Sequence, residues 1–184
     1  MTDMDDDPLP VMVPRSDRLL VRTPPERVRR LRKHLIVTLR ALRTVKEAAK
    51  RKVSPPPREP DGFAARVAGT ACGLCKGWCC KNGEDDAFLD EQTLLRVRRA
   101  RPALKARAVL RLFVDRVPAD AYEGSCIFHG KQGCALDRSL RSDVCNSYFC
   151  GGLQNYLTGG DLAVPAVVIA GEGGKMRTSP VLTP

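Results

Sequence analysis

Aromatic residues are scarce in this sequence. They make up only 5% of the 184 residues, although 43% of the chain is hydrophobic. A hydrophobic core can therefore form, but aliphatic side chains must build most of it. We expect this core to be small, and small cores commonly need a further stabiliser such as bound metal or disulfides.

The sequence also lacks a long hydrophobic run. Its longest apolar stretches are residues 162–170, interrupted by Pro165, and residues 35–39, interrupted by Thr38. Both fall short of the roughly 20 apolar residues of a membrane-spanning helix. Residues 1–7 are acidic, whereas a secretory signal begins with basic residues and continues with an apolar segment. We therefore expect a cytoplasmic protein without a transmembrane segment, in which the cysteines are reduced or metal-bound.

Familiar catalytic motifs are missing as well. The chain has no G-x-S-x-G sequence, no H-E-x-x-H sequence and no dinucleotide-binding fingerprint. Residues 171–175 are glycine-rich, but Ile169 and Met176 stand where a phosphate-binding loop needs glycine and a hydroxyl residue. We interpret this stretch as a turn. The sequence identifies no catalytic residue and leaves open whether the protein is an enzyme.

Eight cysteines are the main feature that the sequence does contain. Four of them fall within nine residues, C-G-L-C-K-G-W-C-C, and four more follow downstream. A C-x2-C pair lets two sulfurs converge on one ion, and neighbouring glycines relax the backbone. We interpret all eight as metal ligands, rather than as structural disulfides or reactive thiols: Cys72, Cys75, Cys79, Cys80, Cys126, Cys134, Cys145 and Cys150.

The spacing of the cysteines does not identify the metal. Thiolates suit zinc and iron–sulfur clusters, and eight can form two four-thiolate sites or one cluster with remaining thiols. Cys79 and Cys80 are adjacent, and successive side chains of an extended chain point apart, so these sulfurs can serve different sites or different metals of one cluster. His129 follows Cys126 by three residues and is a further candidate ligand, although a turn position is the simpler interpretation.

The rest of the sequence predicts an α-rich α+β fold, with a small metal-stabilised cysteine-cluster domain behind a basic amphipathic helix. In the helix segment, apolar residues recur at helical spacing from Val28 to Ala49. Residues 26–52 carry eleven basic and two acidic residues, a net charge of +9. We predict five segments: mostly disordered residues 1–24 with a short extended piece at residues 19–21, the helix at 25–52, a proline-rich linker at 53–62, the metal-binding domain at 63–158, and a C-terminal extension with short strands at 159–184.

Within the predicted metal-binding domain, Asp90 is placed to cap a helix that ends near Arg101. Pro102 can open a second helix. Cys126 and Cys134 lie on a predicted hairpin with a glycine-containing turn. We expect a short helix or irregular turn to follow at residues 137–149.

The cysteine pattern resembles the YkgJ family of cysteine-cluster proteins, described as zinc- or iron-chelating domains. The resemblance covers residues 72–150 and rests on C-x2-C-x3-C-C, the aspartate-capped helix, C-x7-C and two further cysteines. The family commonly has Arg-Pro and Cys-Arg pairs where this chain has Arg141-Ser142 and Cys145-Asn146. Flagellin lysine N-methylases carry a similar cysteine pattern and are linked to an iron–sulfur cluster.

These observations predict a metal-binding protein that holds zinc or an iron–sulfur cluster. The resemblance to the methylases implies an alternative, an iron–sulfur-dependent enzyme that modifies protein. The basic helix suggests another, a zinc module associated with nucleic acid. That helix could equally contact a protein partner or an anionic membrane surface. It contains no aromatic residue, so any nucleic-acid binding would be non-specific.

Overall fold

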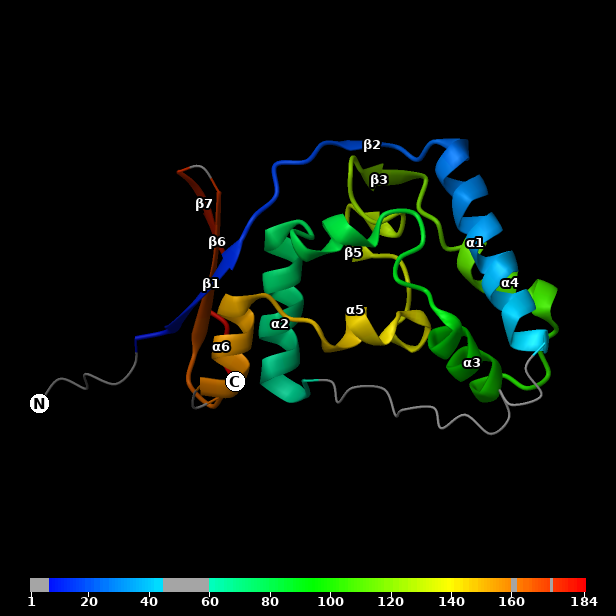
Figure 1. The fold of residues 1–184 in the computed structure, drawn as a ribbon. Coiled ribbons are helices and arrows are strands. Elements are labelled where there is room, and N and C mark those ends of the chain that lie inside the picture. The colour runs from blue at the N-terminus through cyan, green and yellow to red at the C-terminus, as the bar shows by residue number, and fades with distance from the viewer. Residues whose placement is uncertain (1–6, 45–59, 160–161, 173) are drawn as a thin grey trace, which may run out of the picture. The chain divides into compact units, whose positions relative to one another are not determined.

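The computed structural model describes residues 7–44, 60–159, 162–172 and 174–184, and they form two units of a mixed α+β fold (Figure 1). Unit 1 comprises the described parts of residues 1–18, 58–79 and 148–184, and unit 2 those of residues 19–57 and 80–147. The α+β class was predicted, but the boundaries differ, because residues 63–158 contribute to both units. Among the described helices, none combines the length and the apolar character that crossing a membrane requires.

Unit 1 contains a three-stranded sheet in the order β1-β6-β7. Strand β1 (Leu9–Pro14) runs parallel to β6 (Ala166–Glu172), which pairs antiparallel with β7 (Lys175–Thr178). The predicted strands of the C-terminal extension are confirmed. Within the described part of the N-terminal segment, the predicted disorder is wrong at residues 9–14, because β1 obtains its hydrogen-bonding partner from the opposite end of the chain. Its prolines are tolerated because β1 is an edge strand.

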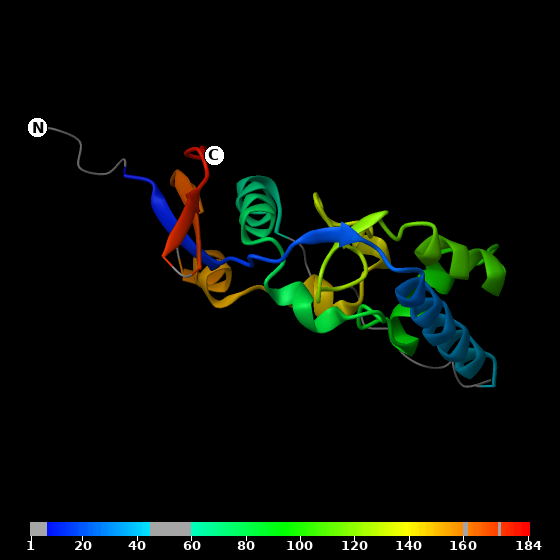
Figure 2. The same cartoon turned by 90° about the horizontal axis from the view of Figure 1, so that it is seen from above.

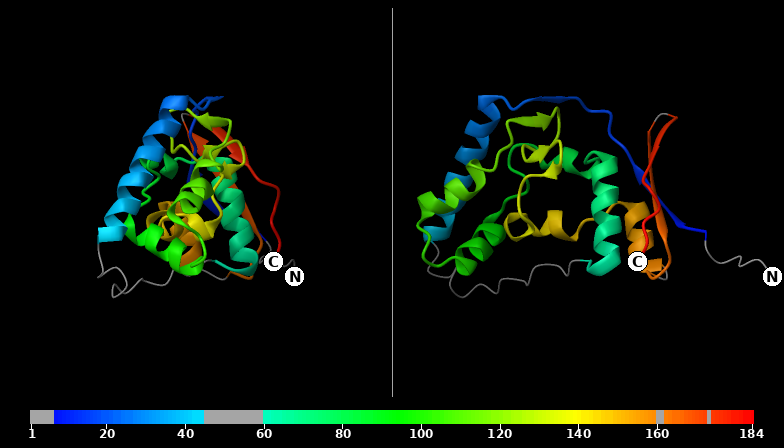
Figure 3. Two further views of the ribbon diagram at one scale, coloured as in Figure 1. Left: turned by 90° about the vertical axis from the view of Figure 1, so that its right-hand side faces the viewer. Right: turned by 180° about the vertical axis from the view of Figure 1, so that it is seen from behind.

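Two helices, α2 (Gly62–Cys75) and α6 (Gly151–Gly159), pack on the same face of this sheet (Figure 3). Val11 and Val13 alternate with exposed neighbours along β1, as expected for a strand with one buried face. The buried positions of α2 recur every three to four residues and meet that face. The resulting core is aliphatic and small, as the composition predicts.

Unit 2 is built around helix α1 (Pro25–Thr44), which packs against α3 (Glu91–Ala100) and α4 (Ala106–Val114) (Figure 2). The helix begins at Pro25, as predicted. Its apolar stripe is buried in the core of the unit, so the prediction of a helix tethered in front of the domain is wrong. Periodicity identifies an apolar stripe but cannot show which surface covers it. Residues 45–59, which include the rest of the predicted helix and most of the linker, lie outside the described residues.

The elements around the downstream cysteines follow the prediction in part. Asp90 caps α3, where its carboxylate accepts hydrogen bonds from the Thr93 N–H at 2.8 Å and the Thr93 hydroxyl at 2.7 Å. The second helix, α4, begins at Ala106 and not at the predicted Pro102. The predicted hairpin is formed by β4 (His129–Gly130) and β5 (Gly133–Cys134), but Cys126 precedes it instead of lying on it. The short helices η3 (Arg138–Leu140) and α5 (Asp143–Ser147) come next.

A second short sheet in unit 2 was not predicted. Strand β2 (Leu20–Arg22) pairs antiparallel with β3 (Asp120–Tyr122). Strand β2 overlaps the extended piece expected at residues 19–21, so the described part of the N-terminal segment contains two strands. Both strands depend on partners that lie far away in the sequence.

Polar contacts, as well as its apolar stripe, hold helix α1 against the rest of unit 2. Arg27 Nε lies 2.5 Å from the Asp85 carboxylate, and Arg27 Nη2 donates to the carbonyl of Ser125 at 2.5 Å. Arg30 pairs with the other carboxylate oxygen of Asp85. Burial alone would raise the pKa of Asp85, but the hydrogen bonds from Arg27 and Arg30 outweigh it and hold the pKa below its ordinary value of 3.8.

Replacement of Asp85 with asparagine is therefore expected to weaken the dependence of folding stability on pH under acidic conditions. A carboxylate whose pKa is lowered on folding contributes stability above its unfolded-state pKa, here 3.8, and this contribution is lost as the pH falls through the folded-state pKa. Denaturant unfolding should show wild type more stable than Asp85→Asn at about pH 7, with the gap closing near pH 3.

The matched control is Asp115→Asn, which changes an exposed carboxylate outside this ion pair. Its pH profile should follow that of wild type. Parallel profiles for wild type and Asp85→Asn would contradict the proposed role of Asp85 in anchoring α1.

Candidate metal centres

All eight cysteines lie in the part of the chain that the structure describes, and each carries a thiol rather than a disulfide. They divide equally between the two units. Unit 1 contains Cys72, Cys75, Cys79 and Cys150, and unit 2 contains Cys80, Cys126, Cys134 and Cys145. Sequence order would group Cys80 with the first three cysteines and Cys150 with the last four. In the structure, Cys80 lies in unit 2 and Cys150 lies in unit 1.

The four cysteines of unit 1 line one cavity with a volume of about 20 Å³. Cys72 and Cys75 lie one turn apart at the end of α2, so their side chains share a helix face. Cys79 begins the short helix η2 (Cys79–Gly83), and Cys150 immediately precedes α6. The rest of the lining is mainly apolar and aromatic: Val13, Pro14, Ala71, Trp78, Tyr148, Phe149 and Leu153.

The backbone after α2 turns back toward the Cys75 sulfur. Lys76 and Gly77 have φ angles of 49° and 65°, both in the left-handed region. This turn lets the Gly77 N–H donate to Cys75 Sγ at 3.2 Å, while the Ser16 N–H donates to the Cys75 carbonyl at 3.0 Å. The end of α2 is thus held in a fixed conformation around a nearly buried sulfur.

Burial raises the pKa of the Cys75 thiol. Hydrogen bonds from the backbone N–H groups of Trp78 and Gly77 lower that pKa, whereas Cys79 and Cys150 raise it through charge repulsion. Backbone N–H donors favour a thiolate at this position, and the neighbouring sulfurs make a cation favourable.

In unit 2, Cys126 lies in the hydrophobic core, and Cys80 and Cys134 pack against that core. The Cys126 N–H donates to the carbonyl of Cys80 at 3.0 Å, which joins η2 to the segment before the hairpin. Gly83 allows this close approach, since a Cβ at that position would lie 3.0 Å from Cys126 Cβ and 3.2 Å from its sulfur. Cys134 lies opposite His129 in the β4–β5 hairpin.

The Cys126 thiol is the most strongly perturbed group in this cluster. Its pKa is raised to about 12, mainly by burial and also by the neighbouring Cys134 and Cys145, whereas the backbone N–H of Phe128 and the charge of Arg27 act to lower it. All three cysteines belong to unit 2. A cation bound among them would take the place of the proton.

Residues 84–88 carry unusual backbone conformations beside these cysteines. Glu84, Ala87 and Phe88 have φ angles of 37°, 53° and 55°, which residues other than glycine rarely adopt. The Cys145 sulfur lies 4.0 Å from the carbonyl oxygen of Ala87, and the Ile127 N–H donates to the Glu84 carbonyl at 2.7 Å. Such conformations cluster at functional sites, because the surrounding structure must hold them.

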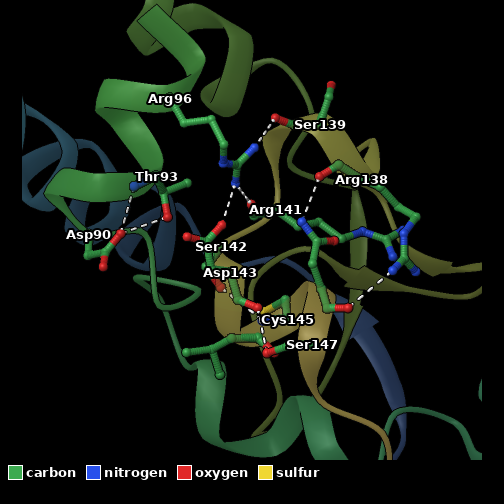
Figure 4. A network of polar contacts seen from close by, with 12 residues as sticks. Asp90, Thr93, Arg96, Arg138, Ser139, Arg141, Ser142, Asp143, Cys145 and Ser147 are labelled. Carbon is green, nitrogen blue, oxygen red and sulfur yellow. Dashed lines mark hydrogen bonds and ion pairs between the residues drawn. The ribbon is translucent and has the colours of Figure 1, made fainter. Parts of the chain in front are cut away.

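The segment that carries Cys145 is held from α3 by Arg96 (Figure 4). Arg96 donates to the carbonyls of Ser139 at 2.9 Å and Arg141 at 2.5 Å. It also forms an ion pair with Asp143 at 3.2 Å. The Cys145 N–H in turn donates to the Ser142 hydroxyl at 3.2 Å. Sequence reasoning did not identify Arg96, because nothing in the pattern distinguishes it from the many other arginines.

Asn146 occupies the position at which the YkgJ pattern commonly has arginine. Its side chain is buried, and its amide donates to the carbonyl of Arg138 at 3.0 Å, while Arg138 Nη2 donates to the Asn146 carbonyl at 3.2 Å. The departure from the pattern is therefore accommodated by a structural contact within the segment that presents Cys145.

His129 is buried and lies in strand β4, not in the turn position that was the simpler interpretation of the sequence. Its Nδ1 lies 2.9 Å from the Ser125 hydroxyl, and the centre of its ring lies 4.6 Å from that of Tyr122. Its assignment as a further candidate ligand stays a prediction.

The arrangement of the sulfurs is open rather than closed. Nowhere in the described residues do three or more His, Cys, Asp or Glu side chains form a group able to hold a metal ion as they stand. No family model, curated protein or solved structure matches the chain. The similarity to YkgJ proteins stays a prediction. The features that bear on function are the four cysteines of unit 1 and the four cysteines of unit 2.

Proposed function

We propose that the protein binds metal through its cysteines, as zinc or as an iron–sulfur cluster. The observation that carries this proposal is the convergence of four cysteines, from three segments of the chain, on one small cavity in unit 1. A buried cysteine can be an ordinary small apolar residue, but four lining a single cavity supply the number of thiolates that a tetrahedral site requires.

The dimensions of the cavity favour a single ion in unit 1. Its volume of about 20 Å³ matches roughly one water-sized sphere, so the cavity has room for an ion the size of zinc. A cluster of four iron and four sulfide ions is larger than this cavity. Zinc is therefore the better fit to the structure, while the cysteine pattern shared with flagellin lysine N-methylases favours iron.

The residues of the chain supply ligands and shape the ligand environment. Cys75 is oriented by the N–H groups that follow α2, and Cys126 is held by its hydrogen bond to Cys80. Thiolates are the binding form, so the buried thiols must release their protons as metal enters. Bound zinc would supply a cross-link without redox chemistry, and an iron–sulfur cluster would supply an electron acceptor.

The proposal is tested by elemental analysis and a visible spectrum of the full-length protein purified without oxygen. Stoichiometric zinc in a colourless preparation is expected if the cavity decides the metal. A brown preparation containing iron and sulfide would confirm metal binding and assign the cluster instead. Metal-free protein that takes up neither zinc nor iron after reduction would overturn the proposal.

A second candidate function rests on the exposed face of α1. Its basic residues stay at the surface although its apolar stripe is buried: Arg29, Arg30, Arg32, Lys33 and Arg40. Such a face suits phosphate contacts with nucleic acid, which are electrostatic and independent of sequence. This activity would accompany metal binding rather than replace it.

A further inference from the structure

We propose that the protein has two separate metal sites, one in each unit, and that the adjacent residues Cys79 and Cys80 belong to different sites. This inference rests on the proposed metal binding and adds the ligand sets. The first set is Cys72, Cys75, Cys79 and Cys150, and the second is Cys80, Cys126, Cys134 and Cys145. Sequence order alone would place Cys80 in the first set and Cys150 in the second.

The first set follows from shared surroundings in unit 1. All four of its cysteines line the same cavity. Cys150 packs against the unit 1 core that contains Cys75. It therefore occupies the place that sequence order would assign to Cys80.

The second set follows from contacts within unit 2. Cys80 is bound to Cys126 through the hydrogen bond from the Cys126 N–H, and both contact the same hydrophobic core. Cys134 packs against this core as well, and the Cys145 sulfur lies 4.0 Å from the carbonyl oxygen of Ala87, which is part of the core. Arg96 and Ser142 hold the Cys145 segment in place. Four thiols are again gathered within one unit, although three of them are far from Cys80 in the sequence.

The local geometry of η2 explains why neighbouring cysteines separate. In a 3-10 helix, successive side chains are about 120° apart, so Cys79 and Cys80 cannot project in the same direction. Cys79 contributes to the cavity of unit 1, and the carbonyl of Cys80 binds Cys126 in unit 2. The C-C pair is therefore the point at which the chain passes from one ligand set to the other.

The test compares three double variants that each remove two thiols from the full-length chain. Cys75→Ser/Cys150→Ser changes only the first set, Cys80→Ser/Cys126→Ser changes only the second, and Cys75→Ser/Cys80→Ser changes both. Titration with Co²⁺ under reducing, oxygen-free conditions counts the sites through thiolate-to-metal absorption. Wild type should bind two equivalents, the first two variants one each, and the third none.

Grouping by sequence order predicts a different result. Cys75→Ser/Cys80→Ser would then keep one equivalent and Cys75→Ser/Cys150→Ser would lose both, which would overturn the inference. A single equivalent in wild type would overturn it as well. Wild-type protein that binds no Co²⁺ or iron at all would instead defeat the underlying proposal of metal binding.

A second measurement avoids dependence on how well the variants fold. Wild-type protein is depleted to one metal per molecule, alkylated, and analysed by mass spectrometry of the molecules that retain one metal. The protected cysteines should form one complete set, so that Cys79 and Cys80 are never protected in the same one-metal molecule. Joint protection of Cys72, Cys75, Cys79 and Cys80 would refute the proposed sets.

Discussion

Replacing Gly152 with alanine is expected to destabilise unit 1 by at least about 3 kcal/mol, the upper end of what an overpacked site usually loses. A Cβ at this position of α6 would lie 1.6 Å from the carbonyl oxygen of Met12 and 2.8 Å from its carbonyl carbon. The contact is with backbone, so no side-chain rotation can relieve it. Strand β1 would have to leave its register with β6, or α6 would have to leave the sheet.

The neighbouring glycine provides a matched control. Gly151 also lies in α6, but a Cβ there would meet nothing within 4 Å, so Gly151→Ala should change the stability by less than about 0.5 kcal/mol. Denaturant unfolding can be followed through the fluorescence of Trp78, the only tryptophan of the chain, which lies in unit 1. Equal unfolding midpoints for the two variants would contradict the close approach of α6 to β1.

Local sequence signals predicted the elements that depend on local interactions. Proline at the start of α1, aspartate before α3 and the glycine-containing turn between β4 and β5 each act within a few residues, and each marks a structure that forms. Strand β1 was missed for the opposite reason, and β2 was expected only as a short extended piece. Their sequences are short and contain or adjoin prolines, and they become strands only because β6 and β3 provide distant partners.

The candidate site shows the same contrast between features with a local sequence signal and features that depend on distant contacts. Residue type and spacing predict the eight cysteines as ligands, and the adjacency of Cys79 and Cys80 already indicates that they can serve different sites. Which distant cysteine lies with each of them could not be predicted, because Cys150 in unit 1 and Cys126 in unit 2 are far along the chain. The supporting residues carried no signal of their own. Arg27 and Arg96 are two among many basic residues, and the close contacts of Gly83 and Gly152 appear only once the backbone is folded.

Removal of the metal is expected to have the largest effect of all, on the order of 10 kcal/mol for each structural site. This expectation rests on the proposed function. The total stability of a small domain is about 5–15 kcal/mol, and the aliphatic core of unit 1 is small, so depletion should unfold this unit. Incubation with a chelator under reducing conditions should shift the Trp78 emission toward that of solvent-exposed tryptophan, and added zinc should reverse the shift.

The Cys75→Ser variant shows whether this effect acts through the proposed ligands. Its sulfur is nearly buried and interacts with Cys79 and Cys150, so its loss should remove the metal of unit 1 and lower the unfolding midpoint reported by Trp78. Because the site is then already empty, the chelator should cause no further change in that midpoint. An unchanged midpoint in metal-depleted wild type would show that metal is not part of the fold. A further loss of stability on chelation of Cys75→Ser, reported by Trp78, would show that Cys75 is not a ligand.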